Sequence, residues 1–166
     1  MPIKQHSVDV VFRNDPADFV PGTLQLLPLG YEVVHPRAGS SETWVYVLAQ
    51  ANLIAGNIVC IHDGASPLVP FNVSPQSGPW TAAVGVAQNT IHSGEYGFIL
   101  KRGVGVVLYA GGAVATKAMT FWHSLTGLAA ENSVDSSVGP GGLGYNLETK
   151  TAVADFTVDA WISCLG

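Results

Sequence analysis

Charge is the scarcest property of this sequence. Only 11% of its 166 residues are Asp, Glu, Lys or Arg, against about 25% in ordinary soluble domains. None of these four residue types occurs between Asp63 and Glu95. A free monomer normally needs more surface charge than this to stay dispersed, so we expect partner chains to cover much of the surface. The alternative is a stable neutral monomer with a surface of Ser, Thr, Asn and Gln.

Basic residues are the rarer of the two charged classes. The chain has seven Lys and Arg and twelve Asp and Glu, which gives a net charge of −5 with His neutral. Only Lys101 and Arg102 are adjacent. Nucleic-acid binding depends on clustered cations that release counterions from phosphates, so we expect no nucleic-acid partner.

Cysteine and long apolar runs are also scarce. Met1–His6 begins no apolar run, which argues against a signal peptide. The stretch Trp44–Ile61 is interrupted by Gln, Asn and Gly, so it predicts two strands and a turn rather than a membrane span. We expect the two cysteines, Cys60 and Cys164, to be free thiols in a reducing cytosol.

No arrangement of residues specifies catalysis, a metal or a cofactor. Gly139–Gly144 fits G-x-G-x-x-G, but a Ser-rich loop precedes it and a predicted strand follows, whereas a dinucleotide site needs a strand and then a helix. Cys60, His62 and Asp63 lack the second ligand pair that zinc usually requires. The nucleophile motif G-x-S-x-G does not occur. We therefore predict that the protein is not an enzyme and has no catalytic, metal-binding or cofactor-binding residues.

The sequence is rich in β patterns. Aromatic and β-branched residues alternate in Trp44–Ala49, and strands are also predicted at Ile58–His62, Trp80–Ala87, Tyr96–Lys101 and Val104–Ala110. The clearest alternation runs from Ala152 to Ile162. The segments Gly85–Thr90 and Gly144–Thr149 both read Gly-x-x-x-x-Thr, and each precedes a polar turn and a predicted strand. We predict a mainly β fold, either a small β-sandwich or a β-barrel.

One stretch has helical rather than β spacing. Its apolar residues recur at intervals of three or four: Ala118, Phe121, Trp122, Leu125 and Ala129. A short amphipathic helix near 117–131 is therefore an alternative to a strand, although Thr116 just before it, Thr120, Thr126 and Gly127 weaken it.

Residues 1–42 differ from the remainder of the chain. Four of the ten prolines lie there: Pro16, Pro21, Pro28 and Pro36. Because proline removes a backbone donor and disfavours helix before itself, we divide the chain into an extended N-terminal arm, residues 1–42, and a β domain, residues 43–166. The arm either reaches a neighbouring subunit or packs on its own domain, with Ser7–Phe12 as a strand.

Three residues are candidates for contact with another chain. Trp161 lies on the face of the terminal strand opposite Phe156 and Ile162, so it points outward if those two fill the core. Val10 and Phe12 are the candidates within the arm. Exposed aromatic residues also form sugar-stacking platforms, although they more often fill cores or subunit interfaces.

Several short motifs resemble those of one protein family. They are Ala55–Val59, Ala83–Ala87, Ser93–Gly103 and Gly142–Tyr145, the last followed by the terminal strand. In this order they resemble small tailed-phage capsid decoration (cement) proteins, over roughly residues 52–166. Asn57 stands where that family usually has an acidic residue, and the arm has no counterpart there.

The resemblance implies a trimeric β-sandwich or β-barrel protein bound outside an icosahedral phage capsid. Its partners would be the phage major capsid protein and further copies of this chain, on a virion assembled in the host cytoplasm. Its role would be to bridge coat-protein subunits and to stabilise the shell against internal genome pressure. The alternative is a host-surface or glycan-binding module of a phage tail or fibre. Neither role involves a membrane or a cofactor.

Overall fold

The computed structural model describes residues 15–37, 40–61, 72–75, 83–123, 127–131 and 142–164. These residues form twelve strands and one 3-10 turn, Pro16–Asp18. The strands are Glu32–Arg37 (β1), Ser40–Ala49 (β2), Ile58–Ile61 (β3), Asn72–Ser74 (β4), Ala83–Ala87 (β5), Tyr96–Tyr109 (β6), Val114–Ala115 (β7), Thr120–His123 (β8), Ala129–Glu131 (β9), Gly144–Asn146 (β10), Lys150–Thr151 (β11) and Phe156–Ser163 (β12). The predicted mainly β fold is confirmed.

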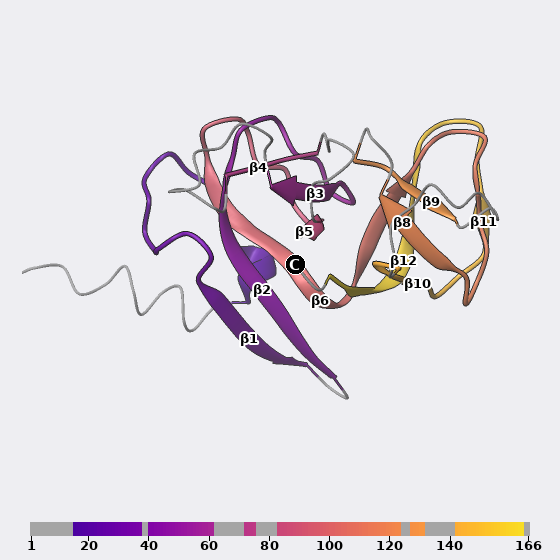
Figure 1. Ribbon diagram of the computed structural model, residues 1–166, viewed down its shortest axis with the longest axis horizontal. Coiled ribbons are helices and arrows are strands. Elements are labelled where there is room, and N and C mark those ends of the chain that lie inside the picture. Colours follow the sequence, from indigo (N-terminus) through magenta and orange to yellow (C-terminus); the bar gives the residue numbers. More distant parts are fainter. Residues whose placement is uncertain are drawn as a thin grey trace, which may run out of the picture.

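The strands close into two small barrels that lie side by side (Figure 1). The first barrel runs β2-β4-β3-β5-β6 and closes through the β2–β6 pairing. The second barrel runs β6-β12-β10-β8-β9 and closes through the β6–β9 pairing. Strand β6 belongs to both rings, so neither barrel is complete without it.

The long strand β6 changes partners along its length. Tyr96–Leu100 and Arg102 pair with β2, whereas Arg102–Tyr109 pairs with β12, so the two pairings overlap at Arg102. Gly103 lies at the change, with φ of +134° and only 2.7 Å between its ideal Cβ position and Cγ of Glu42. Any larger residue would clash there and adopt an unfavourable backbone conformation. The two strands that the sequence separates at Gly103 are therefore one continuous strand with a glycine at its crossing point.

Each barrel has an apolar interior built by alternating residues. In the first barrel, Val45, Val47, Val59 and Ile99 are fully or almost fully buried and belong to one core cluster. In the second barrel, the inward residues of β12 are buried: Phe156, Val158, Ala160 and Ile162. The predicted inward face of the terminal strand is therefore correct from Phe156 on, where the strand begins; Ala152 before it is partly buried, and Val153–Asp155 are exposed.

The two Gly-x-x-x-x-Thr segments have equivalent places in the two barrels. Gly85 lies on β5, which pairs with β6, and Gly144 lies on β10, which pairs with β12. In both cases a Cβ would collide with a carbonyl oxygen of the neighbouring strand, that of Leu100 or that of Trp161. The shared glycine therefore reflects a close approach of backbones in each barrel.

The alternative of a helix near 117–131 is wrong for the residues described there. Thr120–His123 and Ala129–Glu131 are antiparallel strands, with Phe121 opposite Glu131 and His123 opposite Ala129. Phe121 is fully buried in the second barrel, and Gly127, at φ +77°, supports a turn between the strands. Tertiary pairing overrides the helical spacing because these strands close the ring.

The described part of the N-terminal arm packs on its own domain. Strand β1 pairs with β2, and Gly22 bridges to Tyr96. The ring of Phe19 contacts those of Tyr46 and Phe98 edge-on, at centroid distances of 6.0 and 5.2 Å. The predicted strand Ser7–Phe12 lies outside the described residues, and the boundary between residues 42 and 43 falls inside β2.

Candidate protein-binding surface

Trp161 lies on the outer face of the second barrel. Its neighbours Ala160 and Ile162 point into the core and are fully buried, whereas Trp161 is partly exposed. This placement agrees with the outward position predicted from the alternation of the terminal strand. The other two candidates, Val10 and Phe12, lie outside the described residues.

Strand register places two further large side chains beside Trp161. Tyr145 of β10 is directly opposite Trp161, and Val104 of β6 is opposite it on the other side. Tyr145 is 42% exposed and Val104 is 46% exposed. Because directly opposed residues on adjacent strands are side-chain neighbours, the three form a continuous row across β6, β12 and β10, which we call the aromatic row.

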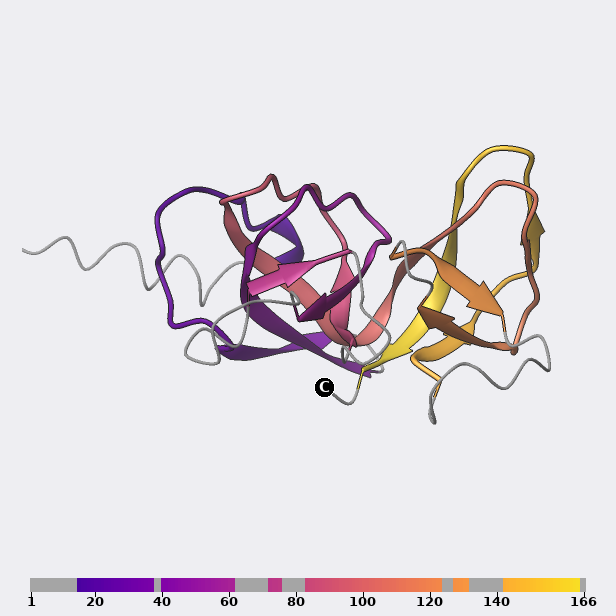
Figure 2. The ribbon, with the colours of Figure 1, turned by 45° about the horizontal axis from the view of Figure 1, so that its top comes forward.

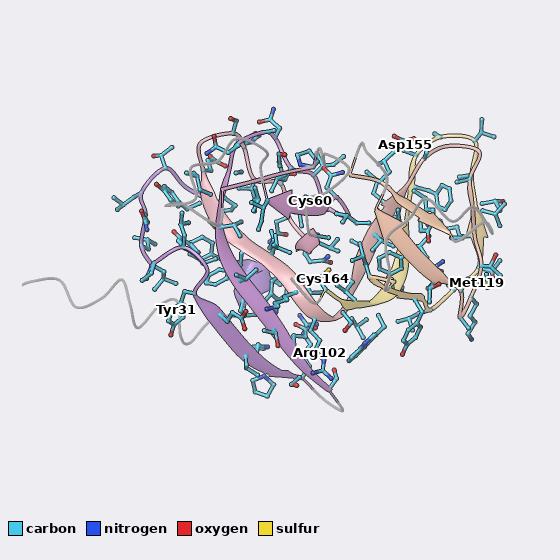
Figure 3. The ribbon with its side chains drawn as sticks, viewed as in Figure 1. Tyr31, Cys60, Arg102, Met119, Asp155 and Cys164 are labelled. Atoms are coloured by element: carbon cyan, nitrogen blue, oxygen red, sulfur yellow. The ribbon has the colours of Figure 1, made fainter. Side chains whose placement is uncertain are left out.

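Charged groups flank the aromatic row without interrupting it. Arg102, two residues before Val104 on β6, and Asp159, two residues before Trp161 on β12, are both exposed. Figure 3 shows Arg102 near the crossing point of the two barrels. An aromatic centre with charge only at its edges is the usual anatomy of a protein-contact surface. Alternation within the terminal strand pointed to Trp161 but not to Tyr145 or Val104, because the register between distant strands cannot be read from the pattern of one strand.

A cluster of charged side chains connects the N-terminal segment to β1 and β2. The guanidinium of Arg37 contacts Oδ2 of Asp15 at 2.8 Å and Oε1 of Glu42 at 3.0 Å. Oε2 of Glu42 accepts a hydrogen bond from the indole of Trp44 at 3.1 Å. The Glu42 side chain is only 2% exposed, so Arg37 supplies the charge that compensates this buried carboxylate.

Among the described residues, one group has metal-ligand chemistry: Asp15, His35 and Glu42, whose ligand atoms lie within 4.8 Å of one another. Both carboxylates of this group already contact Arg37. A metal ion would have to displace or adjoin that guanidinium, which makes a structural ion-pair cluster the better account. No sequence motif marks this cluster, since its members come from three separate segments.

The cysteines are poorly suited to nucleophilic chemistry. Cys60 and Cys164 are both buried, and burial, with a smaller contribution from Cys60, raises the pKa of Cys164 to about 12. A thiol with so high a pKa is protonated and unreactive at neutral pH. Figure 3 shows both cysteines near the middle of the molecule, where the barrels meet. His62 and Asp63, which follow Cys60, lie outside the described residues.

The comparisons with known proteins assign no family. No family model and no curated protein matches the chain. Among solved structures, one that is similar is "The crystal structure of head fiber gp8.5 N base in bacteriophage phi29". It is 14% identical with a TM-score of 0.45, and the match covers 75% of this chain and 98% of that chain. In the described part of the chain, no helix has the length and apolar character needed to cross a membrane.

Proposed function

We propose that this chain is a structural protein of a tailed-phage virion, bound outside the icosahedral capsid, where it stabilises the shell by bridging coat-protein subunits. The observation that carries the proposal is the aromatic row, in which Val104, Trp161 and Tyr145 are neighbours on the outer face of a chain with very little charge. The resemblance of residues 52–166 to capsid decoration proteins supports the same role.

The physical logic of this role is avidity. A small aromatic surface gives only modest affinity in a single contact, because association costs translational and rotational freedom. When a trimer of this chain repeats that contact on a symmetric shell, the overall affinity for the shell rises without any single strong site. The proposed partners are therefore the phage major capsid protein and two further copies of this chain.

The proposal places the protein on the capsid exterior of a virion assembled in the host cytoplasm. It includes no catalytic role, no cofactor, no nucleic-acid partner and no membrane partner. The net charge of −5 supports the exclusion of nucleic acid, since clustered cations are needed to bind phosphates.

The test is binding to purified shells, measured by cosedimentation of the full chain. Wild type should sediment with the shells, and Trp161→Ala should lower the retained fraction at least about tenfold, since aromatic anchors dominate such interfaces. Ile54→Ala is the matched control, because Ile54 is 48% exposed and lies between β2 and β3, neither of which pairs with β12 or β10. Failure of wild type to bind, or equal binding by Trp161→Ala, would contradict the proposal.

A glycan-binding module of a tail or fibre is the second candidate. It is favoured by one observation: Trp161 and Tyr145 are adjacent on one sheet face, with exposed Thr120 next along the row to supply hydrogen bonds. Titration with a panel of saccharides, followed by tryptophan fluorescence, separates the two candidates. A saturable signal that is lost in Trp161→Ala, from a protein that does not bind shells, would favour the glycan-binding role.

A further inference from the structure

The outer face of the second barrel carries two exposed charges of opposite sign, one on each side of the aromatic row. Arg102 lies two residues before Val104 on β6 and directly opposite Ser163 on β12. Asp159 lies two residues before Trp161 on β12. Because side chains alternate along a strand, Asp159, Trp161 and Ser163 share one face, and Arg102 shares that face with its partner Ser163. The row therefore has a cation at one margin and an anion at the other.

The two charges are far enough apart to be recognised separately. Ser163, beside Arg102, is four residues from Asp159. Residues of a strand advance about 3.3 Å each, so the two charges lie roughly 13 Å apart along the strand direction, with Trp161 midway between them. This spacing exceeds the Debye length of about 8 Å at physiological ionic strength, so the two charges do not neutralise each other.

Arg102 is available to a partner, unlike the cations nearest to it. Lys101, the preceding residue, contacts Oε1 of Glu32 at 2.7 Å, and Arg37 contacts two carboxylates. The Arg102 side chain is exposed and makes no ion pair with any residue that the structure describes. Tryptophan, tyrosine and arginine are the residue types that most often carry the binding energy of protein interfaces. All three therefore occur together on this face.

At the other margin, the charges around Asp159 offset one another apart from Asp159 itself. Oε1 of Glu148 accepts a hydrogen bond from the N–H of Asp159 at 3.2 Å, and Nζ of Lys150 donates to a carbonyl of β12 at 2.8 Å. One of these side chains is an anion and the other a cation. Further from the row, the exposed residues Lys117 and Asp155 are again one of each sign. The exposed carboxylate of Asp159 therefore sets the net charge of this margin.

We propose that the aromatic row docks in a single orientation on a coat-protein surface that presents a carboxylate beside Arg102, a cation beside Asp159 and an apolar patch between them. The inference rests on the proposed function, and it adds the chemistry and the polarity of the partner surface. A guanidinium group matches a carboxylate through two parallel hydrogen bonds. Opposite charges across an interface speed encounter and fix the register, whereas the reversed orientation brings like charges together.

A fixed orientation matters for a protein that repeats on a symmetric shell, because every copy must meet its neighbours in the same way. Apolar contact is non-directional, so the aromatic row alone does not supply that orientation. The charges at its two margins supply it, because they make the two ends of the contact surface different.

The test reverses the polarity of this face without changing the net charge. The full-length double variant Arg102→Glu/Asp159→Lys, which we call the swapped variant, exchanges the two signs and keeps both the aromatic row and the net charge of −5. At about 0.1 M salt it should cosediment with purified shells at least about tenfold less than wild type. At about 1 M salt the Debye length falls to about 3 Å, so the ratio between the two proteins should approach one.

Asp18→Lys and Asp159→Lys form a matched pair of single variants. Both replace an exposed aspartate by lysine, so both change the net charge by the same amount. Asp18 lies in the 3-10 turn, which Figures 1 and 2 both show beside the first barrel, away from β10 and β12. At about 0.1 M salt, Asp159→Lys should lower shell binding, whereas Asp18→Lys should bind at least as well as wild type. Equal losses in the two variants would overturn the inference.

The outcomes separate this inference from the proposed function. Wild-type binding by the swapped variant, with Trp161→Ala still defective, would overturn the fixed orientation and leave the proposed function intact. A difference that persists unchanged at about 1 M salt would overturn its electrostatic basis. A wild-type protein that binds a saccharide, or nothing, instead of shells would overturn both. Ultracentrifugation without shells completes the test: an oligomer that the swapped variant fails to form would assign this face to a second copy and overturn the inference.

Discussion

The hydroxyl of Tyr109 donates a hydrogen bond of 3.0 Å to Oδ1 of Asn146 inside the second barrel. Both residues are at most 1% exposed, and they come from strands β6 and β10, which are not adjacent in the sheet. The Asn146 side-chain amide also donates to the carbonyl of Thr116 at 3.3 Å. Together, the two hydrogen bonds of Asn146 therefore connect β10 to β6 and to the loop before β8.

Tyr109→Phe should lower the free energy of unfolding by about 1–3 kcal/mol, because it leaves a buried polar group of Asn146 with one partner fewer. Chemical denaturation followed by circular dichroism measures the change. Tyr145→Phe is the matched control: it removes the hydroxyl of a tyrosine that is 42% exposed, and the expected change is within about 0.5 kcal/mol. Equal effects of the two variants would show that the bond does not stabilise the barrel.

Phe156→Ala should cost about 3–5 kcal/mol of unfolding free energy, the range for truncating a buried aromatic ring. Phe156 is 6% exposed and stacks on Tyr109 at a centroid distance of 5.7 Å. The same denaturation experiment measures this change. Val153→Ala, three residues earlier in the exposed turn, should be neutral, and a loss below ~1 kcal/mol for Phe156→Ala would contradict the assignment of this ring to the core.

Arg37→Met should destabilise the protein by about 1–3 kcal/mol, because it leaves the carboxylate of Glu42 buried without its cation. The effect stays below that of a fully buried pair since the Arg37 side chain is 47% exposed. Lys101→Met is the control, because it breaks a more exposed pair with Glu32 and should cost at most about 1 kcal/mol. Thermal melts rank the two variants, and the opposite ranking would exclude a stabilising role for this cluster.

Alkaline pH should destabilise the fold through Cys164. Its pKa rises from 9.0 to about 12 on folding, so the folded state holds the thiol proton where the unfolded state has lost it. The contribution is complete below pH 9 and is lost as pH rises towards 12. Denaturation curves measured at several pH values across that range give the free energy of unfolding at each pH. Cys164→Ala should reduce the decrease of this free energy with rising pH. At neutral pH a thiol reagent should label Cys164 only after unfolding, and rapid labelling of the native protein would contradict the burial argument.

Deleting residues 1–42 should lower the melting temperature sharply. The deletion removes β1, the first three residues of β2 and the Phe19 ring that packs on Tyr46 and Phe98. It also exposes a sheet edge and the apolar surface beneath it. A truncated protein with the melting temperature of the full chain would show instead that these residues act only through a partner.

Local pattern was enough to predict several strands. The terminal strand has inward Phe156, Val158, Ala160 and Ile162 and an outward Trp161, as period-two alternation requires. Alternation depends only on one strand and on the environments of its two faces, so it can be recognised without knowing which strands lie beside it. The same local reading was ambiguous at Phe121, because helical spacing over a few residues is compatible with a strand that closes a ring.

The sequence by itself determined the β character, the inward face of β12, the repeated Gly-x-x-x-x-Thr pattern and the scarcity of charge. Only the tertiary structure decided that β6 serves two barrels, that Tyr145 and Val104 join Trp161 in a row, and that Asp15, Arg37 and Glu42 meet. The reason is the range of the interactions: side-chain alternation is local, whereas strand pairing and ion pairing join segments that are distant along the chain.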